Sequence, residues 1–313
     1  MKKKTIEKIL RDKMNVWLGS ILDEGLRTKV GDSLMVSGGC IANLFLKEPV
    51  NDFDVYIQDM DVLIALAEYY TKSHHISVLD GRMRKQLIEE FITDKYEDNG
   101  SYEYNDGFVD FERFNMDSSI GAVILRTLQA DQVKLHLPNG GEEIGYDASE
   151  LDNGELPEYR PIYFSPNAIT LSDDLQIVTR FSGSPEQIHT NYDFVHATNY
   201  FTMKDGLVLN EKALTCLLTR ELIYQGSKYP ITSVIRTKKF INRGYTITAG
   251  EYLKMCYQIS ELDLKNPDVM EEQMIGVDIA YFDKLISIMR GYDESKGSYQ
   301  GFLFAMIEKI FGE

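Results

Sequence analysis

The chain is poor in cysteine and in long apolar runs. Its three cysteines, Cys40, Cys216 and Cys256, are widely spaced and form no CxxC or Cys/His ligand set. A disulfide framework and a structural zinc site are therefore not expected, and a reducing, cytosolic setting is the default. The longest apolar runs, such as Val62–Ala67, are far shorter than the roughly 20 residues that span a bilayer, so we expect no membrane span.

Positive charge is also scarce, because 33 Lys and Arg stand against 49 Asp and Glu, a formal net charge of −16. That balance excludes a polycation that grips nucleic acid with its whole surface, although it leaves room for a local basic groove. The basic opening resembles a signal peptide, but no apolar stretch of about 7–15 residues follows it. The 43 % of hydrophobic residues suit a soluble globular protein with a sizeable core.

Hydrophobic periodicity predicts an α+β fold with two domains. Residues 1–205 are predicted to form a mixed β-sheet with helices, and residues 206–313 an α-helical domain. In the first part we expect short strands at 33–36, 52–57 and 192–201, with further β-like runs between about 99 and 182. The predicted helices are 4–28, 40–47, 59–72, 80–97, 211–225, 231–243, 248–260, 270–290 and 297–311.

The segment from Val36 to Ile57 carries the most chemical information. A predicted strand ends in Ser37-Gly38-Gly39, a short helix follows, and a second strand opens with Asp52-Phe53-Asp54. Residues two apart on a strand share a face, so the two carboxylates either share a proton or bind a hard cation such as Mg²⁺ or Mn²⁺. The glycines permit close backbone approach, and the helix start offers N–H groups to an anion. This combination favours phosphoryl or nucleotidyl transfer.

These residues resemble the signature of the DNA polymerase β-like nucleotidyltransferase superfamily, which includes tRNA CCA-adding enzymes and poly(A) polymerases. The looser pattern of residues 165–196 is similar to viral, especially bacteriophage, members. The resemblance implies that Ser37, Gly38 and Gly39 hold the triphosphate of ATP or another NTP, and that Asp52 and Asp54 bind two Mg²⁺ or Mn²⁺ ions. It also implies transfer of a nucleoside monophosphate to an acceptor hydroxyl in the host cytoplasm, foremost an RNA 3′ end, with release of pyrophosphate.

By the same resemblance, a third carboxylate on a later strand completes the metal site. We place it at Asp193, with Asp110 as the rival. Arg180 and Lys239, the latter in the basic cluster Arg236–Arg243, are candidate phosphate contacts. One departure concerns CCA-adding enzymes, which carry an Arg-Asp pair soon after the glycines; here that helix reads Cys-Ile-Ala-Asn-Leu-Phe-Leu, which argues against CCA addition.

Two alternatives remain. A glycosyltransferase also uses Asp-x-Asp to hold Mn²⁺ and a sugar nucleotide, although its motif usually follows a longer nucleotide-binding unit. A catalytically inactive binding or structural protein would keep the fold without turnover. The acceptor is open between RNA, a protein side chain and a small molecule, and the sequence does not predict the oligomeric state.

Overall fold

The computed structural model describes residues 1–74, 76–89, 132–137, 141–144 and 158–264, with scattered single positions elsewhere. Contacts divide the chain into two units. The first comprises Met1–His189 and Ala197–Asn210, and the second comprises Thr190–His196 and Glu211–Glu313. The chain therefore passes between the units after His189, after His196 and after Asn210. Each unit is described separately below.

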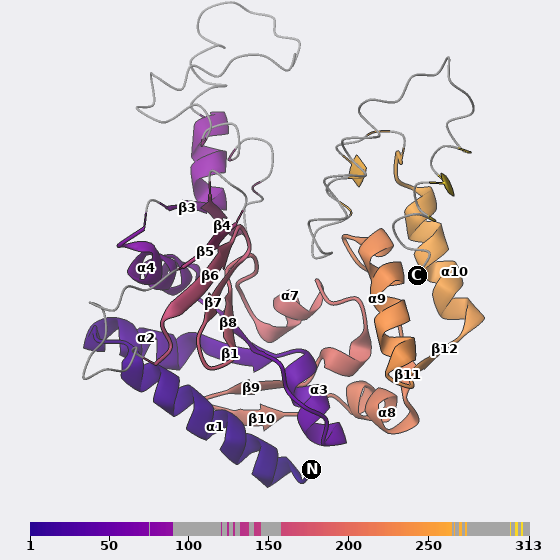
Figure 1. Cartoon of the computed structure of the whole chain (residues 1–313), viewed down its shortest axis with the longest axis horizontal. Coiled ribbons are helices and arrows are strands. Elements are labelled where there is room, and N and C mark those ends of the chain that lie inside the picture. The colour runs from indigo at the N-terminus through magenta and orange to yellow at the C-terminus, as the bar shows by residue number, and fades with distance from the viewer. Residues whose placement is uncertain are drawn as a thin grey trace, which may run out of the picture. The chain divides into compact units, whose positions relative to one another are not determined.

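The first unit is built on an eight-stranded mixed sheet with the order β10-β9-β1-β2-β8-β7-β6-β5 (Figure 1). β2 and β8 are parallel, whereas the other described neighbours are antiparallel. A separate antiparallel pair joins β3 (Ser77–Asp80) to β4 (Val133–His136). The strands of the large sheet are β1 (Leu34–Ser37), β2 (Phe53–Ile57), β5 (Glu142–Glu143), β6 (Pro161–Ser165), β7 (Ala168–Leu171), β8 (Leu175–Val178), β9 (Tyr200–Thr202) and β10 (Gly206–Val208).

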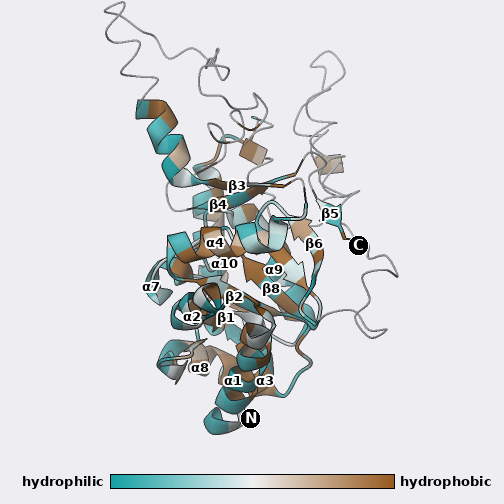
Figure 2. Cartoon of the chain, turned by 90° about the vertical axis from the view of Figure 1, so that its left-hand side faces the viewer, coloured by the Kyte–Doolittle hydropathy of each residue, from teal (hydrophilic) through white to brown (hydrophobic). Residues whose placement is uncertain are grey.

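The helices of the first unit follow amphipathic patterns. They are α1 (Lys3–Ser20), α2 (Glu24–Ser33), α3 (Gly39–Leu46), α4 (Met60–Thr71) and the short α7 (Pro185–His189). Figure 2 shows hydrophilic and hydrophobic residues interspersed along α1 and α2, as expected for helices with one face in a core. The predicted helices at 40–47 and 59–72 are confirmed as α3 and α4. Among the described residues, none of the helices has the length and apolar content needed to cross a membrane.

Two elements predicted within residues 1–205 are wrong. The single helix at 4–28 is two helices, because the chain turns at Ile21 and Asp23 caps α2 by accepting a hydrogen bond from the Leu26 N–H at 2.9 Å. The strand at 192–201 is reduced to Tyr200 and Phe201 of β9, preceded by a 3₁₀ turn, η2 (Val195–Ala197). Val195, one of the side chains that suggested a strand, packs instead with Ala213 and Cys216 of the second unit.

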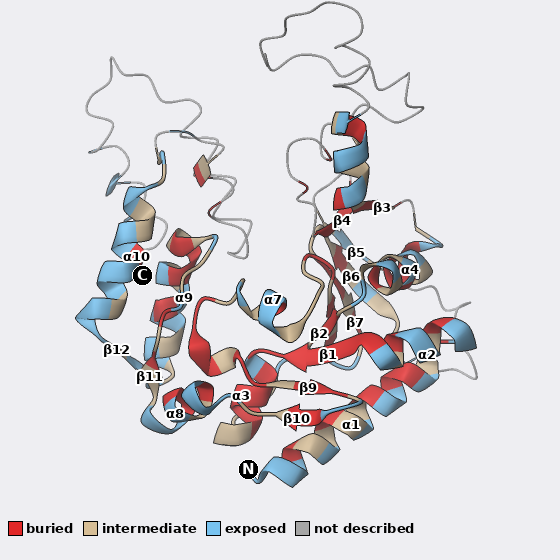
Figure 3. Cartoon of the chain, turned by 180° about the vertical axis from the view of Figure 1, so that it is seen from behind, coloured by how far each residue is buried: buried red, intermediate tan, exposed pale blue. Residues whose placement is uncertain are grey.

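One face of the sheet forms the core of the first unit. A row of apolar residues crosses it in register, one from each strand between β6 and β10, and none is more than 1 % exposed: Phe164, Ile169, Ile177, Val55, Val36, Phe201 and Leu207. Buried side chains of α1, α2 and α4 join the same cluster, and Figure 3 shows the buried strands β1, β9 and β10 beside the half-buried α1.

The second unit contains α8 (Glu211–Thr219), α9 (Pro230–Asn242), α10 (Ala249–Ser260) and a parallel pair, β11 (Glu221–Leu222) with β12 (Thr246–Ile247). The predicted helices at 231–243 and 248–260 are confirmed. The helix predicted at 211–225 ends at Thr219, because Arg220 has a left-handed backbone with φ of 56°. In the first unit, residues 81–89 form the described part of the helix predicted at 80–97. Most of the predicted helices 270–290 and 297–311 lies outside the described residues. The predicted class, a mixed sheet with helices followed by a helical region, is confirmed.

Candidate functional site

The turn between β1 and α3 has a backbone that only glycine adopts readily. Gly38 has φ of 97° and ψ of −151°, and its N–H donates to the Ala197 carbonyl at 3.2 Å. No side chain caps α3. A Cβ placed on Gly39 would meet no atom within 4 Å, so the start of α3 borders open space. The turn therefore presents helix N–H groups that an anion can approach.

The two aspartates lie at this same turn. Asp54 is in β2, and Asp52 immediately precedes the strand. Burial and the nearby Asp52 carboxylate raise the pKa of Asp54 to about 7. The thiol of Cys40, in the first turn of α3, also has a raised pKa, owing to burial and to both aspartates, Asp54 first. Asp52, Asp54 and the N-terminal end of α3 are thus brought together.

Asp54 belongs to a row of mostly polar side chains on the sheet face opposite the apolar core. Register places Asp54 beside Gln176, and the Val36–Val55 pair puts Ser37 beside Asp54 in the next position. Continuing over the neighbouring strands, the row contains one residue from each strand between β5 and β9. We call this set the polar row: Glu143, Tyr163, Thr170, Gln176, Asp54, Ser37 and Tyr200.

Ser37 is fixed by hydrogen bonds inside the first unit. Its side chain is fully buried, its hydroxyl donates to the Asn199 carbonyl at 3.0 Å, and its oxygen lies 2.9 Å from Nε2 of His189 in α7. Burial lowers the pKa of His189 to about 4, an effect that Glu186 partly offsets, so the ring is neutral at pH 7. When the hydroxyl donates to Asn199, His189 donates its Nε2–H to Ser37. These bonds hold the residue before Gly38 in place.

Sequence reasoning missed Gln176 and His189. Both reach the site through pairings between residues more than 100 positions apart: Gln176 lies in register with Asp54, and His189 contacts Ser37. Both lie within the looser pattern of residues 165–196, but that pattern assigns them no role, and only the tertiary structure places them at the site.

Asp193, predicted as the third carboxylate, lies in the second unit. Its side chain is 5 % exposed, accepts from Arg236 at 2.7 Å and from Ser227 at 3.2 Å, and so joins residues 190–196 to α9. The rival, Asp110, lies outside the described residues. Within the part of the chain that the structure describes, no three or more His, Cys, Asp or Glu residues are grouped as a metal site.

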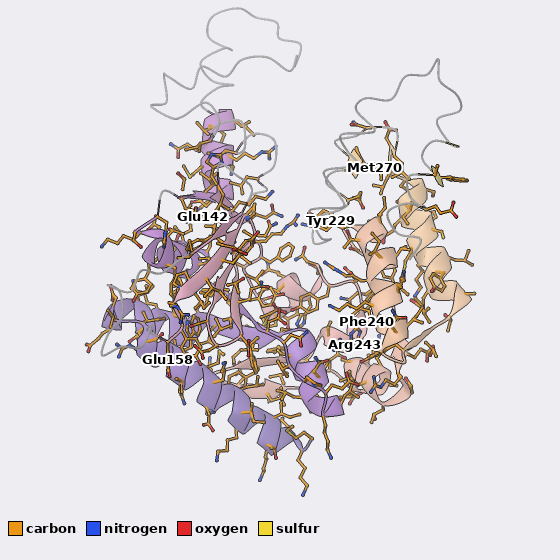
Figure 4. All side chains as sticks on the ribbon, in the orientation of Figure 1. Glu142, Glu158, Tyr229, Phe240, Arg243 and Met270 are labelled. Carbon is orange, nitrogen blue, oxygen red and sulfur yellow. The ribbon has the colours of Figure 1, made fainter. Side chains whose placement is uncertain are left out.

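The two predicted cationic contacts lie apart from this turn or in the other unit. Arg180 lies two residues beyond the end of β8, whereas Asp54 is level with Gln176 near the start of that strand. Lys239 is an exposed residue of α9 in the second unit. Figure 4 shows Phe240 and Arg243 near the C-terminal end of that helix. The roles of Arg180 and Lys239 stay predictions.

Comparisons with known proteins identify one family. The model of the Gabija anti-defense 2 family matches residues 8–220 of this chain. A curated relative, "Gabija anti-defense 2" of Bacillus phage SPbetaL7, is 26 % identical over 108 residues, which is 34 % of this chain and 27 % of the relative. The chain thus matches about a quarter of that relative's length.

Among solved structures, the Thermotoga maritima CCA-adding enzyme complexed with tRNA has a TM-score of 0.36 and 12 % identity, covering 89 % of this chain and 52 % of the enzyme. The Bacillus stearothermophilus CCA-adding enzyme in complex with CTP has a TM-score of 0.36 and 10 % identity, covering 86 % and 50 %. This chain spans about half the length of both enzymes, and similarity at this level says nothing about activity.

The raised pKa of Asp54 predicts a stability that falls as pH rises. The folded carboxyl keeps its proton up to about pH 7, whereas the unfolded carboxyl loses it near the ordinary value of 3.8. Without divalent cations, Asp54→Asn should be more stable than the parent at pH 8 by on the order of 2 kcal/mol, and the difference should vanish near pH 4. Denaturant unfolding in EDTA measures this. The exposed Asp12→Asn is the control, and a pH-independent difference would contradict the prediction.

The contacts of Asp193 predict a stabilising role. Asp193→Asn should lower the free energy of unfolding by about 1–3 kcal/mol, because it breaks a charged hydrogen bond to the half-exposed Arg236. Ser227→Ala should have a smaller effect, since it removes a neutral donor at 3.2 Å. Thermal unfolding compares the two variants. If Asp193→Asn leaves stability unchanged but abolishes binding of Mg²⁺ with ATP, Asp193 is the third metal ligand instead.

Proposed function

Because the chain belongs to the Gabija anti-defense 2 family, we propose that it counters the Gabija defense in the host cytoplasm by nucleotidyl transfer. In this reaction an acceptor hydroxyl attacks the α-phosphorus of an NTP and pyrophosphate leaves. The supporting observation is the convergence of Asp52 and Asp54 on the glycine turn at the start of α3. The sequence resemblance to nucleotidyltransferases supports the same reaction.

The donor set fits a hard divalent cation. Carboxylate oxygens are the ligands that Mg²⁺ and Mn²⁺ prefer, and burial and the Asp52 carboxylate raise the pKa of Asp54, an effect that a bound cation would oppose. Asp52 and Asp54 would hold the cation, which neutralises triphosphate charge and lowers the pKa of the attacking hydroxyl when bound. Gly38 and Gly39 would orient the phosphates through backbone N–H groups, and the Ser37–His189 pair would keep that turn in place.

The other candidate residues have the following proposed roles. Ser37 would affect nucleotide binding indirectly, because it holds the adjacent Gly38 in position. Arg180 and Lys239 would contact phosphate, and Asp193 or Asp110 would complete the metal site. The acceptor implied by the resemblance is an RNA 3′ end. A glycosyltransferase or an inactive binding protein would replace this function if the experiments below fail.

The two glycines should respond differently to substitution. Gly38→Ala should destabilise the protein by about 1–3 kcal/mol, because its φ of 97° disfavours a side chain. Gly39→Ala should leave stability nearly unchanged, since its Cβ meets no atom within 4 Å, yet it should weaken ATP binding by filling the space before the helix. Thermal unfolding and calorimetric titration with ATP and Mg²⁺ measure both effects. Full ATP affinity in Gly39→Ala would show that phosphate does not bind at this turn.

Transfer itself is tested with α-labelled NTPs, Mg²⁺ and extract of a bacterium that carries the Gabija defense. Wild-type protein should release pyrophosphate and label an acceptor, whereas Asp52→Asn/Asp54→Asn should do neither. Asp12→Asn, an exposed change on α1, is the matched control. Binding of ATP without transfer would favour an inactive binding protein. Labelling from a sugar nucleotide alone would favour the glycosyltransferase.

A further inference from the structure

The polar row extends well beyond the aspartates. From Asp54 it continues over Gln176 on β8, Thr170 on β7 and Tyr163 on β6 to Glu143 on β5. Four strand spacings of about 4.8 Å make roughly 19 Å, the length of five or six residues of extended polypeptide. Glu143 is exposed and the other four side chains are half-buried, whereas the apolar residues of β2, β8, β7 and β6 in the adjacent row on the opposite face are buried. This half of the polar row is therefore available to a ligand.

Beyond Asp54, the polar row consists of neutral hydrogen-bonding side chains followed by one carboxylate at its outer end. Gln176 donates from Nε2 to the Thr170 hydroxyl oxygen at 3.3 Å. That bond leaves the Thr170 hydroxyl proton as a donor and the Gln176 carbonyl oxygen as an acceptor. Tyr163 adds a phenol and an aromatic face, and Glu143 adds a negative charge. Peptide groups and hydroxyl or basic side chains are the natural complement of such a surface.

The same chemistry disfavours a nucleic acid. Binding to a phosphate backbone depends on Lys and Arg, and the polar row contains neither. The formal net charge of the whole chain is −16, which repels a long polyanion. In the basic cluster of the second unit, Arg236 is already paired with Asp193 at 2.7 Å. The observations therefore favour a polypeptide acceptor over the RNA 3′ end that the resemblance implied.

We propose that the acceptor is a hydroxyl-bearing side chain on a neutral or basic polypeptide segment bound along Gln176, Thr170, Tyr163 and Glu143. This inference rests on the proposed nucleotidyl transfer. The acceptor oxygen forms a bond to the α-phosphorus, and the bond from that phosphorus to the pyrophosphate oxygen breaks. Pyrophosphate leaves with the electron pair, and the acceptor proton passes to water. The product is a protein carrying a phosphodiester-linked nucleotide.

The two residues of β5 provide a matched pair for the test. Glu143 is in register with Tyr163 of the polar row, whereas Glu142 is in register with the buried Phe164, so the two side chains belong to opposite faces. Both glutamates are exposed, so their replacement should not affect folding. Figure 4 labels Glu142 on this strand. Glu143→Lys and Glu142→Lys therefore make the same change of charge on different faces.

The experiment incubates each full-length variant with a mixture of the four α-labelled NTPs, Mg²⁺ and the extract used above. The labelled product is then digested with protease or with nuclease. We expect label that protease releases and nuclease does not. Glu143→Lys should reduce it about threefold, the effect of one exposed charge contact, while Glu142→Lys should leave it unchanged. Thr170→Val, two strands away from Asp54, should reduce it further without weakening ATP binding.

A polyanionic acceptor gives the opposite result. Nuclease-sensitive label, or label that increases in Glu143→Lys, would overturn the inference and restore RNA as the acceptor. Equal labelling by both lysine variants and by Thr170→Val would also overturn it, because the polar row would then play no part. Absence of any labelled product or pyrophosphate would instead contradict the proposed function itself.

Discussion

The pairing of β1 with β2 is the constraint on which the site depends. Val36 opposite Val55 lies in a buried row, and full burial of each such side chain contributes roughly 1.5–3 kcal/mol. A slip of one residue would move Ser37 and Asp54 to the buried face and expose the valines. The buried apolar row therefore determines which face of the sheet the Asp54 carboxylate occupies. The polar row lies one residue away from it along each strand and so is on the opposite face.

The site places Asp54, whose charged form is disfavoured, among residues that hydrogen bonds hold rigidly. Asp54 is half-buried and held close to a second carboxylate, an arrangement that opposes its charge. The Ser37 hydroxyl, the His189 ring and the glycine backbone beside it are all fixed by hydrogen bonds. Such a combination is typical of a site preorganised for a cationic or metal-bound ligand.

Local patterns in the sequence predicted the parts of the fold that depend on neighbouring residues. The strand-turn-helix-strand segment around Gly38 emerged as β1, α3 and β2, because its apolar runs and glycines act within a few residues. The strand predicted at 192–201 failed because side chains such as Val195 are buried in the second unit, which no local pattern reveals. Gln176 and His189 were not predicted for the same reason, because contacts with residues far away in the sequence bring them to the site. Asp193 was chosen for its place near an expected strand, and its contact with Arg236 could not be anticipated.

The interleaving of the two units determines how the gene can be divided. A fragment that ends at His189 would lack β9 and β10, and with them the Ala197 and Asn199 carbonyls that hold Gly38 and Ser37. A fragment that begins at Glu211 would lack residues 190–196, including the Asp193 partner of Arg236. No single truncation point yields both halves intact. Dissection of this protein therefore requires point substitutions in the whole chain. The alternative is to express each unit from a rearranged gene that joins its two segments directly.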